Sequence, residues 1–334
     1  MSASNSSPQL ITGVARLREE IAAVRREGKR IGLAPTMGAL HEGHLSLVRA
    51  ARAECGCTVV SIYVNPTQFG PNEDFSKYPR TLEADLKLLA GCGADVVFAP
   101  TDDEMYPVGH ATGKKGTDPD QPSVSARRNG PEGASHKWGL SPFSLSTWVE
   151  VGAVAEPLEG QCRPGHFRGV ATVVLKLFNM VQPDAAYFGQ KDFQQAAVIR
   201  RMTADLNLPV AIRVCPIVRE PDGLAMSSRN RYLSPAARQR ATVLWKSLQA
   251  AVALVEEGQR DAQAIAARMR EAIETAEDAQ IDYIALVDPD TFQPVDRIAG
   301  STLAALAVKI ENTRLIDNCL LEPRPQNTAN KFAG

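Results

Sequence analysis

The chain has 334 residues, of which 44% are hydrophobic and 22% are charged, and its formal net charge is −1. These values are typical of a globular protein of about two domains, and the charge argues against a strongly basic surface for nucleic acid. No apolar run reaches the length of a transmembrane helix, and the N-terminus lacks the layout of a signal peptide. The six cysteines form no C-x-x-C pair, which indicates reduced thiols in a cytoplasmic protein.

The first third of the chain alternates between helical and strand patterns. Apolar residues recur at helical spacing between Val14 and Val24. An apolar strand begins at Ile31 and is expected to end at Pro35, because proline cannot donate to a central ladder. The next predicted elements are helix, strand, helix and strand, at residues 45–54, 58–64, 81–90 and 95–100. This alternation indicates parallel βαβ units, which bind ligands at the carboxyl ends of their strands.

Residues 108–147 interrupt this alternation. They are rich in Gly, Pro, Ser, Lys and Arg, and they contain few residues that would suit a core. We predict a long, mobile surface loop here rather than a further domain. Protease cleavage within residues 109–137 that leaves activity intact would support this prediction, and resistance to cleavage would contradict it.

Regular patterns resume after the loop. The predicted order is helix, strand, helix and strand, at residues 170–181, 185–188, 193–206 and 210–218. Ser234 and Pro235 then form a helix-start signal. The elements predicted after it are two helices and three strands, at residues 236–256, 262–276, 281–287, 302–309 and 313–318. We therefore predict an α/β domain with a parallel sheet over residues 1–217, and a smaller α+β lid domain over residues 218–334.

The segment from Pro35 to His44 is the most informative part of the chain. Gly38 and Gly43 let the backbone approach a ligand closely, and His41 and His44 are expected to share one face of a first helical turn. A helix start also presents unpaired N–H groups and the positive end of a dipole, which suit phosphate. These features predict a nucleoside triphosphate site. A solvated histidine pair is the alternative, and a metal site lacks further ligands at suitable spacing.

Three other segments carry candidate site residues. Gln68 offers an amide that can both donate to and accept from a hydroxyl or carboxylate. Lys191 can place its ammonium against phosphate oxygens, and Asp192 can hold a ribose hydroxyl or help to position Mg²⁺. The hydroxyl and guanidinium groups of residues 227–231 suit a triphosphate. Each segment also has a structural alternative, as a loop, a helix N-terminus or a surface turn. The turn at 163–167 has no role that the residues themselves assign.

In this order, these segments resemble the family of pantothenate synthetases, the pantoate–β-alanine ligases. The matching segments are P-T-M-G-x-L-H-x-G-H at 35–44, V-N-P-x-Q-F at 64–69, R-P-G-H-F at 163–167, G-x-K-D-x-x-Q at 189–195, S-S-R at 227–229 and R-L-I-D-N at 314–318. The resemblance spans roughly residues 10–322. It implies a Rossmann-like nucleotidyltransferase domain of the paired-histidine group, which also includes the class I aminoacyl-tRNA synthetases.

The resemblance implies an ATP-dependent condensation in two steps. The carboxylate of pantoate attacks the α-phosphate of ATP and gives pantoyl adenylate and pyrophosphate. The amine of β-alanine then attacks the acyl carbon and releases AMP and pantothenate. Such a site mainly positions the reactants and stabilises phosphoryl charge. Mg²⁺ is expected to accompany ATP without a dedicated protein site, and the family implies a homodimer.

The resemblance also implies roles for individual residues. His44 is the implied catalytic acid, and His41, Lys191, Ser227, Ser228 and Arg229 would assist it. Gln68 and Gln195 would bind pantoate, and Gln68 would also lie near β-alanine. The residues implied in ATP binding are Pro35, Thr36, Met37, Gly38, Ala39, Leu40, His41, Glu42, Gly43, His44, Gly189, Gln190, Lys191, Asp192, Val218, Met226, Ser227, Ser228 and Arg229.

Two departures and two rival functions stand beside this interpretation. Gln190 replaces a glutamate that many relatives carry, and the loop at 108–147 is longer than usual for the family, which leaves dimer geometry and substrate gating open. One rival is a sister nucleotidyltransferase with a phosphate-bearing acceptor, which would need a basic acceptor site. The other is a non-catalytic binding or RNA-recognition module, which predicts lost histidines or a basic surface.

Overall fold

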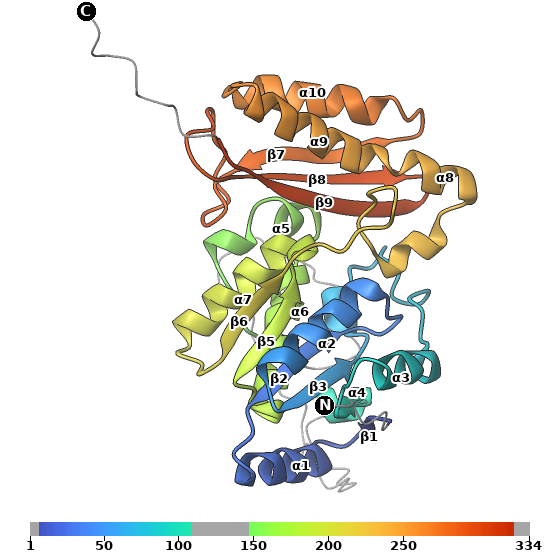
Figure 1. Ribbon diagram of the computed structural model, residues 1–334, viewed down its shortest axis with the longest axis vertical. Helices are drawn as coiled ribbons and strands as arrows, with labels where there is room; N and C mark the ends of the chain where they lie inside the picture. Colours follow the sequence, from blue (N-terminus) through green and yellow to red (C-terminus); the bar gives the residue numbers. More distant parts are fainter. Residues whose placement is uncertain (1–6, 108–146, 324–334) are drawn as a thin grey trace, which may run out of the picture.

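The computed structural model describes residues 7–107 and 147–323. Two parts follow each other along the long axis of the molecule (Figure 1): a six-stranded sheet with its helices, and a three-stranded sheet with its helices. The predicted loop at 108–147 lies, apart from Thr147, outside the described residues. Within those residues, no helix combines the length and the apolar character needed to cross a membrane.

All paired strands of the larger sheet run parallel, in the order β1–β4–β3–β2–β5–β6. The strands are β1 (Gln9–Ile11), β2 (Ile31–Thr36), β3 (Cys57–Ile62), β4 (Val96–Phe98), β5 (Ala185–Gly189) and β6 (Ala211–Cys215). The chain builds outward on one side of β2 through β3 and β4, and on the other side through β5 and β6. The strand order therefore reverses between β2 and β5, where sheets of this class bind ligands. The predicted parallel α/β architecture is confirmed.

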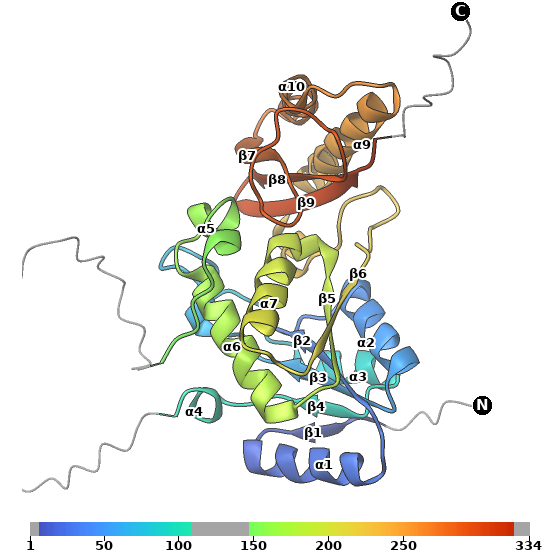
Figure 2. The same cartoon turned by 90° about the vertical axis from the view of Figure 1, so that its left-hand side faces the viewer.

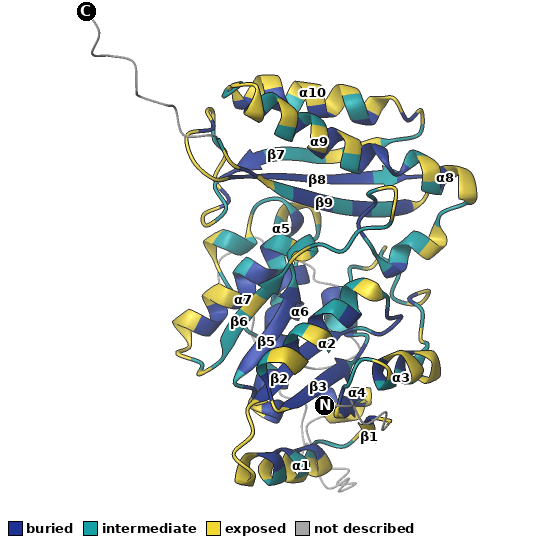
Figure 3. Ribbon diagram, in the orientation of Figure 1, coloured by how far each residue is buried: buried dark blue, intermediate teal, exposed yellow. Residues whose placement is uncertain are grey.

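Helices cover both faces of this sheet (Figure 2). One face packs against α1 (Val14–Arg26), α6 (His166–Val181) and α7 (Phe193–Asp205), and the other against α2 (Glu42–Glu54) and α3 (Leu82–Ala90). Successive strand residues point to opposite faces of the sheet. Leu33 therefore packs in the core beneath α1, α6 and α7, and Ala34 in the core beneath α2 and α3. Both faces are buried (Figure 3), which explains why these strands read as continuous apolar runs.

The C-terminal part is built on an antiparallel sheet, with its own helices on one face and the N-terminal part against the other. Its elements are η4 (Ser228–Tyr232), α8 (Pro235–Arg240), α9 (Val243–Glu256), α10 (Ala262–Glu274), β7 (Gln280–Val287), β8 (Thr302–Ile310) and β9 (Thr313–Leu321). Leu306 and Val308 of β8 pack with the core formed by α9 and α10. Leu303 and Ala305 instead share a cluster with Phe193 of α7. The sheet thus joins its own helices to the N-terminal part.

Short elements connect these layers. They are η1 (Pro66–Gln68), α4 (Asp102–Met105), η2 (Ala153–Ala155), α5 (Glu159–Cys162) and η3 (Gln190–Asp192). The stretch 216–227 joins β6 to η4, and the boundary that we placed between residues 217 and 218 falls in it. That boundary stays a prediction.

Two local predictions differ from the structure, and one short strand was not predicted. Strand β2 continues through Pro35 to Thr36, because β5 pairs with β2 only at Gly32 and Leu33 and requires no bond from the proline. The single helix expected over 236–256 is two helices, α8 and α9. The break lies at Thr242, whose hydroxyl donates to a backbone carbonyl three residues earlier at 2.7 Å. Strand β1 was not predicted, since three residues are too few to show a period.

Candidate active site

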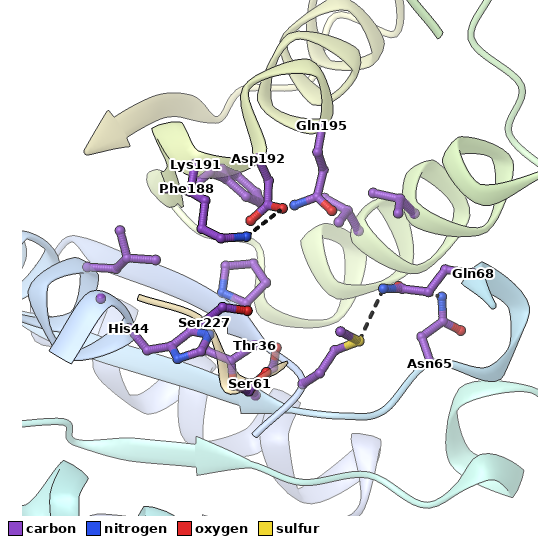
Figure 4. A pocket seen from close by; sticks show the side chains of 18 of the residues that line it. Thr36, His44, Ser61, Asn65, Gln68, Phe188, Lys191, Asp192, Gln195 and Ser227 are labelled. Carbon is purple, nitrogen blue, oxygen red and sulfur yellow. Dashed lines mark hydrogen bonds and ion pairs between the residues drawn. The ribbon is translucent and has the colours of Figure 1, made fainter. Parts of the chain in front are cut away.

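A cavity of about 210 Å³ opens at the carboxyl ends of β2, β3, β5 and β6. It extends from the N-terminus of α2 to η4 of the C-terminal part, and Figure 4 shows side chains from both parts around it. The predicted site residues that line it are Pro35, Thr36, Met37, His41, Gly43, His44, Gln68, Gly189, Lys191, Asp192, Gln195, Val218, Met226, Ser227, Ser228 and Arg229. Segments far apart in the sequence therefore meet in one cavity, as parallel strand ends require.

Five residues expected to bind ATP do not line this cavity: Gly38, Ala39, Leu40, Glu42 and Gln190. The side chain of Glu42 is exposed and pairs with Arg49 further along the same helix. The other four still shape the site through the backbone, since they belong to the two turns that carry the histidines and Lys191.

The turn before the histidines is fixed by Asp85 of α3, a residue that sequence reasoning missed. Its carboxylate accepts the N–H of Ala39 at 3.0 Å and that of Leu40 at 2.8 Å, and it is 1% exposed. Gly38 and Ala39 have φ values of 80° and 51°, in the left-handed region that ordinary residues avoid. The buried Asp85 side chain thus holds a turn in which Ala39 is strained. In the sequence, Asp85 looked like any acidic residue in the first turn of a helix.

The paired histidines cap α2. His41 is the N-cap residue, outside the first turn, and its Nδ1 accepts the N–H of Gly43 at 3.1 Å. His44 lies within the first turn, and its Nδ1 faces the N–H of His41 at 3.4 Å. The expectation that both lie on one helical turn is therefore half right, although the two rings remain adjacent with centroids 4.1 Å apart. Because each Nδ1 accepts, the neutral form of each ring carries its proton on Nε2.

Both imidazoles are held in the neutral form. Burial, and then the Lys191 ammonium, lowers the pKa of His44 to about 4. Burial, followed by His44 and Lys191, lowers the pKa of His41 to about 3. At neutral pH the site therefore presents N–H donors of uncharged imidazole rather than two cations.

We predict that nuclear magnetic resonance titration of the ligand-free protein will find His41 and His44 uncharged down to about pH 5. Their pKa values lie below the ordinary 6.5, so the unfolded chain binds more protons between pH 6.5 and about 4. The contribution of His44 to the free energy of unfolding is therefore fully present above pH 6.5 and is lost as the pH falls toward 4. Titration of either ring near pH 6.5 would contradict this assignment.

Lys191 provides a cation to the site, beside the two arginines Arg163 and Arg229 that also line the cavity. It lies in η3, at the carboxyl end of β5, and its ammonium is 3.9 Å from Oδ1 of Asp192. That separation is an ion pair without a close hydrogen bond, and Figure 4 shows both side chains at the edge of the cavity. Gln195 follows one turn later on α7 and lines the same space.

A pair of amides forms the opposite end of the cavity. The Nε2 of Gln68 donates to the Met37 sulfur at 3.1 Å, which is a weak acceptor, and its Oε1 accepts from Asn65 at 3.1 Å. Asn65 is buried and also donates to the carbonyl of Gly169 at 3.2 Å. Asn65 was noted in the sequence only as part of the segment around Gln68. Its place here is that of a support which orients the Gln68 amide.

The turn at 163–167, to which the sequence assigned no role, fixes the backbone of Gln68. His166 donates from Nδ1 to the carbonyl of Gln68 at 2.8 Å, and its Nε2 accepts from Arg163 at 3.0 Å. Arg163 in turn binds both carboxylate oxygens of Glu73, at 2.7 and 2.8 Å. Burial, followed by the Arg163 charge, lowers the pKa of His166 to about 4, so this ring too is neutral.

Residues 226–229 close the cavity from the C-terminal part. The Ser228 hydroxyl lies 2.9 Å from that of Tyr78, and Arg229 binds both oxygens of Asp74, at 3.0 and 2.8 Å. The guanidinium expected to face a triphosphate is thus already paired across the two parts of the molecule. Tyr78 and Asp74 carried no signal in the sequence.

Among residues 7–107 and 147–323, the structure brings together no group of three His, Cys, Asp or Glu side chains that would hold a metal ion. Asp192 lies at the edge of the cavity, where its carboxylate could contact a metal ion bound to a triphosphate. Metal binding through a triphosphate stays a prediction.

The parallel sheet, the capped helix with its paired imidazoles and the lysine turn define a nucleotidyltransferase-type α/β enzyme. A family model described as pantoate–beta-alanine ligase matches residues 9–320. The chain belongs to this family. It is 49% identical to a pantothenate synthetase of Moorella thermoacetica over 94% of this chain and 99% of that protein, and 54% identical to one of Roseiflexus castenholzii over 87% and 92%.

Solved structures agree with this assignment. A pantothenate synthetase from Thermus thermophilus is similar with a TM-score of 0.80 and 41% identity, covering 94% of this chain and all of that one. A pantoate–beta-alanine ligase from Francisella tularensis, solved in complex with beta-gamma ATP and beta-alanine, gives a TM-score of 0.69 and 30% identity, with 94% and 97% covered. The family and the fold implied by the sequence segments are confirmed.

Proposed function

We propose that this protein condenses pantoate with β-alanine to pantothenate at the expense of ATP, through a pantoyl-adenylate intermediate. One observation carries the proposal: His41, His44 and Lys191 lie around the same cavity as the amides of Gln68 and Gln195. Groups that suit phosphate and amides that suit a small hydroxy acid thus line one cavity. There they can contact ATP and pantoate bound side by side. The complex of the Francisella tularensis relative with beta-gamma ATP and beta-alanine supports the same substrates.

In the first step, a carboxylate oxygen of pantoate forms a bond to the α-phosphorus, and the bond to pyrophosphate breaks. The Nε2–H groups of His41 and His44 and the Lys191 ammonium donate to the phosphoryl oxygens as negative charge moves toward the leaving group. Neutral imidazoles suit this task, since they donate without needing a proton from solvent. Mg²⁺ enters with ATP in this proposal, held by phosphate oxygens and water.

In the second step, the amine of β-alanine attacks the acyl carbon, AMP leaves, and the nitrogen loses a proton. AMP is a far better leaving group than the oxide of a free carboxylate, which is why the first step is needed. The residues contribute mainly by holding the two reactants in register. The position of Gln68 in the cavity, at the end opposite Lys191, supports its contact with both pantoate and β-alanine.

The lining of the cavity near Gln68 supports pantoate as the substrate that is activated. Besides the amides of Gln68 and Gln195, the cavity is also lined by apolar residues of α6, namely Val170, Val173, Val174 and Leu177. Such a surface suits the two methyl groups of pantoate, while the amides suit its hydroxyl and carboxylate groups. The sister nucleotidyltransferase is less favoured, because the nearby cation, Arg163, is already bound to Glu73.

The proposal is tested by following AMP release from ATP in the presence of pantoate, with and without β-alanine. We expect AMP release to require both substrates, and pantoate alone to support exchange of pyrophosphate into ATP. A folded protein that binds ATP but shows neither reaction would contradict the proposal and favour a different acceptor.

We also propose a homodimer and a cytoplasmic location. The first rests on the family resemblance, and the second on the need for ATP as a substrate. The molar mass in solution, measured by light scattering at micromolar concentration, tests the dimer: about 36 kDa would contradict it, and twice that mass is expected.

A further inference from the structure

The segment Arg314–Asn318 on β9 matched the family in sequence, but no role was assigned to it. In the structure, three of its side chains leave the C-terminal sheet and reach α5, the stretch 216–227 and the η3 turn, and η3 carries a residue of the candidate site. Arg314 binds Glu159 at 2.8 Å, Asp317 binds Arg219 at 2.6 Å, and Asn318 binds the turn that carries Lys191. Through Arg314 and Asn318, this segment is one of the places where the C-terminal part contacts the N-terminal part, and Asn318 does so at the turn that carries Lys191.

Asn318 makes the most specific of these contacts. Its Nδ2 donates to the carbonyl of Gln190 and to the carbonyl of Lys191, each at 3.0 Å. Both donors of the amide are used on consecutive carbonyls of η3, and Asn318 as a residue is 3% exposed. A bond to one carbonyl would leave the turn free to rotate about it, whereas bonds to two successive carbonyls fix its direction.

The turn lies between β5 and α7, and its own three residues give it little internal support. It consists of three residues in a 3₁₀ conformation, whose internal hydrogen bonds have poor geometry. Gly189 ends β5 opposite Cys215, and a Cβ built there would meet nothing within 4 Å, so the sheet pairing holds the entry into the turn but no side chain packs there. The Lys191 side chain is long and has many rotamers, and its ammonium reaches the cavity only if the backbone points it there.

Contacts of the neighbouring residue Asp317 hold Asn318 in place. The neighbouring Asp317 is 1% exposed on its side chain and binds both terminal nitrogens of Arg219, at 2.6 and 2.9 Å. The Arg219 guanidinium lies over the ring of Trp245, 3.8 Å from its centroid. The backbone N–H of Asn318 donates to Asp317 at 2.8 Å. These contacts keep the Asn318 amide aimed at the turn.

We propose that Asn318 is a positioning residue for Lys191: its amide fixes the carbonyls of Gln190 and Lys191 and so directs the ammonium to the phosphates of the nucleotide. The inference rests on the proposed function for its catalytic consequence, but the ordering of the turn is a separate property. The C-terminal part then serves the chemistry in two ways: it closes the cavity, and its Asn318 holds the turn that carries Lys191.

The test uses two variants of the full chain. Asn318→Leu keeps the volume and removes both donors, and Asn318→Asp keeps the shape but turns an anion toward two carbonyl oxygens. We expect the single-turnover rate of adenylate formation to fall by about 10- to 100-fold in Asn318→Leu, the loss that a misplacement of about 1 Å produces. Asn318→Asp is expected to lose more. Wild-type rates in both variants would overturn the inference.

A double-mutant cycle separates positioning from general destabilisation. In a Lys191→Met background the ammonium is gone, so Asn318→Leu should change the adenylation rate and the ATP dissociation constant little further. Ile265→Ala is the matched control, because Ile265 is buried in the C-terminal core on α10, away from the turn. It should lower the melting temperature while leaving the rate per folded molecule unchanged. Additive losses in the cycle would overturn the inference.

Hydrogen exchange distinguishes failure of this inference from failure of the proposed function. The peptide spanning residues 189–195 should exchange faster in Asn318→Leu than in the wild type or in Ile265→Ala. If the wild type makes no adenylate but this difference is seen, the proposed function fails and the positioning contact stands. Unchanged exchange in Asn318→Leu overturns the positioning contact, whatever the enzyme makes.

Discussion

Replacing His44 with alanine is expected to lower the rate of pantoyl-adenylate formation by about 10²- to 10³-fold, as loss of one donor to developing charge typically does. The Nδ1 of His44 is committed to the N–H of His41, so its Nε2–H is the group left to face the substrate. The fold should persist, since the side chain supports one helix end and its loss costs about 1 kcal/mol. The measurement is the pre-steady-state rate of adenylate formation, with circular dichroism to verify folding.

Two conservative variants show which nitrogen matters. Asn places an oxygen near the position of Nδ1 and keeps the helix cap, but has nothing at Nε2. Gln places an amide N–H near the position of Nε2. We expect His44→Asn to be as slow as His44→Ala, and His44→Gln to recover part of the rate. Near-normal turnover in His44→Ala, or recovery by Asn but not by Gln, would contradict the assignment of Nε2 as the donor.

Most of the larger elements could be predicted because their cause is local. The strands of the parallel sheet are apolar runs that stop at Gly, Pro or Asn, and the helices between them show a period of 3.6 residues. Once the order is strand, helix, strand, the carboxyl ends of the strands must lie along one edge. His44, Gln68 and Lys191 each follow such a strand, so their meeting in one cavity was predictable without coordinates.

The contacts that hold these residues in place could not be predicted, because their cause is distant in the chain. Asp85 holds the Ala39 turn across 46 residues, and Asn318 holds the Lys191 turn across 127. In sequence, Asp85 is an acidic residue in a helix and Asn318 a polar residue in a strand. What makes each of them a support is burial next to unpaired backbone groups of another segment, and no local pattern records that.

The same distinction applies to Arg229, whose role in binding phosphate stays a prediction. Its charge and its place in the cavity fit that role, but its pairing with Asp74 depends on how the C-terminal part packs against residues 74–78. The arrangement has a functional consequence, because ATP that claims this guanidinium must compete with Asp74. Whether Arg229 binds ATP or holds the two parts together through Asp74 therefore depends on how the parts pack, and not on its residue type.

Gly169→Ala is expected to disturb pantoate binding more than any change to an exposed residue. Gly169 lies in α6 against η1, and a Cβ built there would be 2.3 Å from the carbonyl oxygen of Thr67 and 2.8 Å from Cα of Gln68. Both contacts are backbone, so no side chain can rotate away. The turn that carries the Gln68 amide must shift, and the bond from Asn65 to the Gly169 carbonyl must stretch with it.

The substitution separates strain from helix propensity. Alanine favours a helix interior over glycine by about 1 kcal/mol, so any loss of stability comes from the clash, which typically costs about 1–3 kcal/mol. We expect the pantoate KM to rise by about tenfold or more, as a misplaced positioning group implies, with a smaller change in the ATP dissociation constant. Gly300→Ala is the matched control, since its Cβ would meet nothing within 4 Å. If Gly169→Ala kept the wild-type pantoate KM and the wild-type free energy of unfolding, the amide of Gln68 would not depend on this contact, and its place at the acceptor end would need another support.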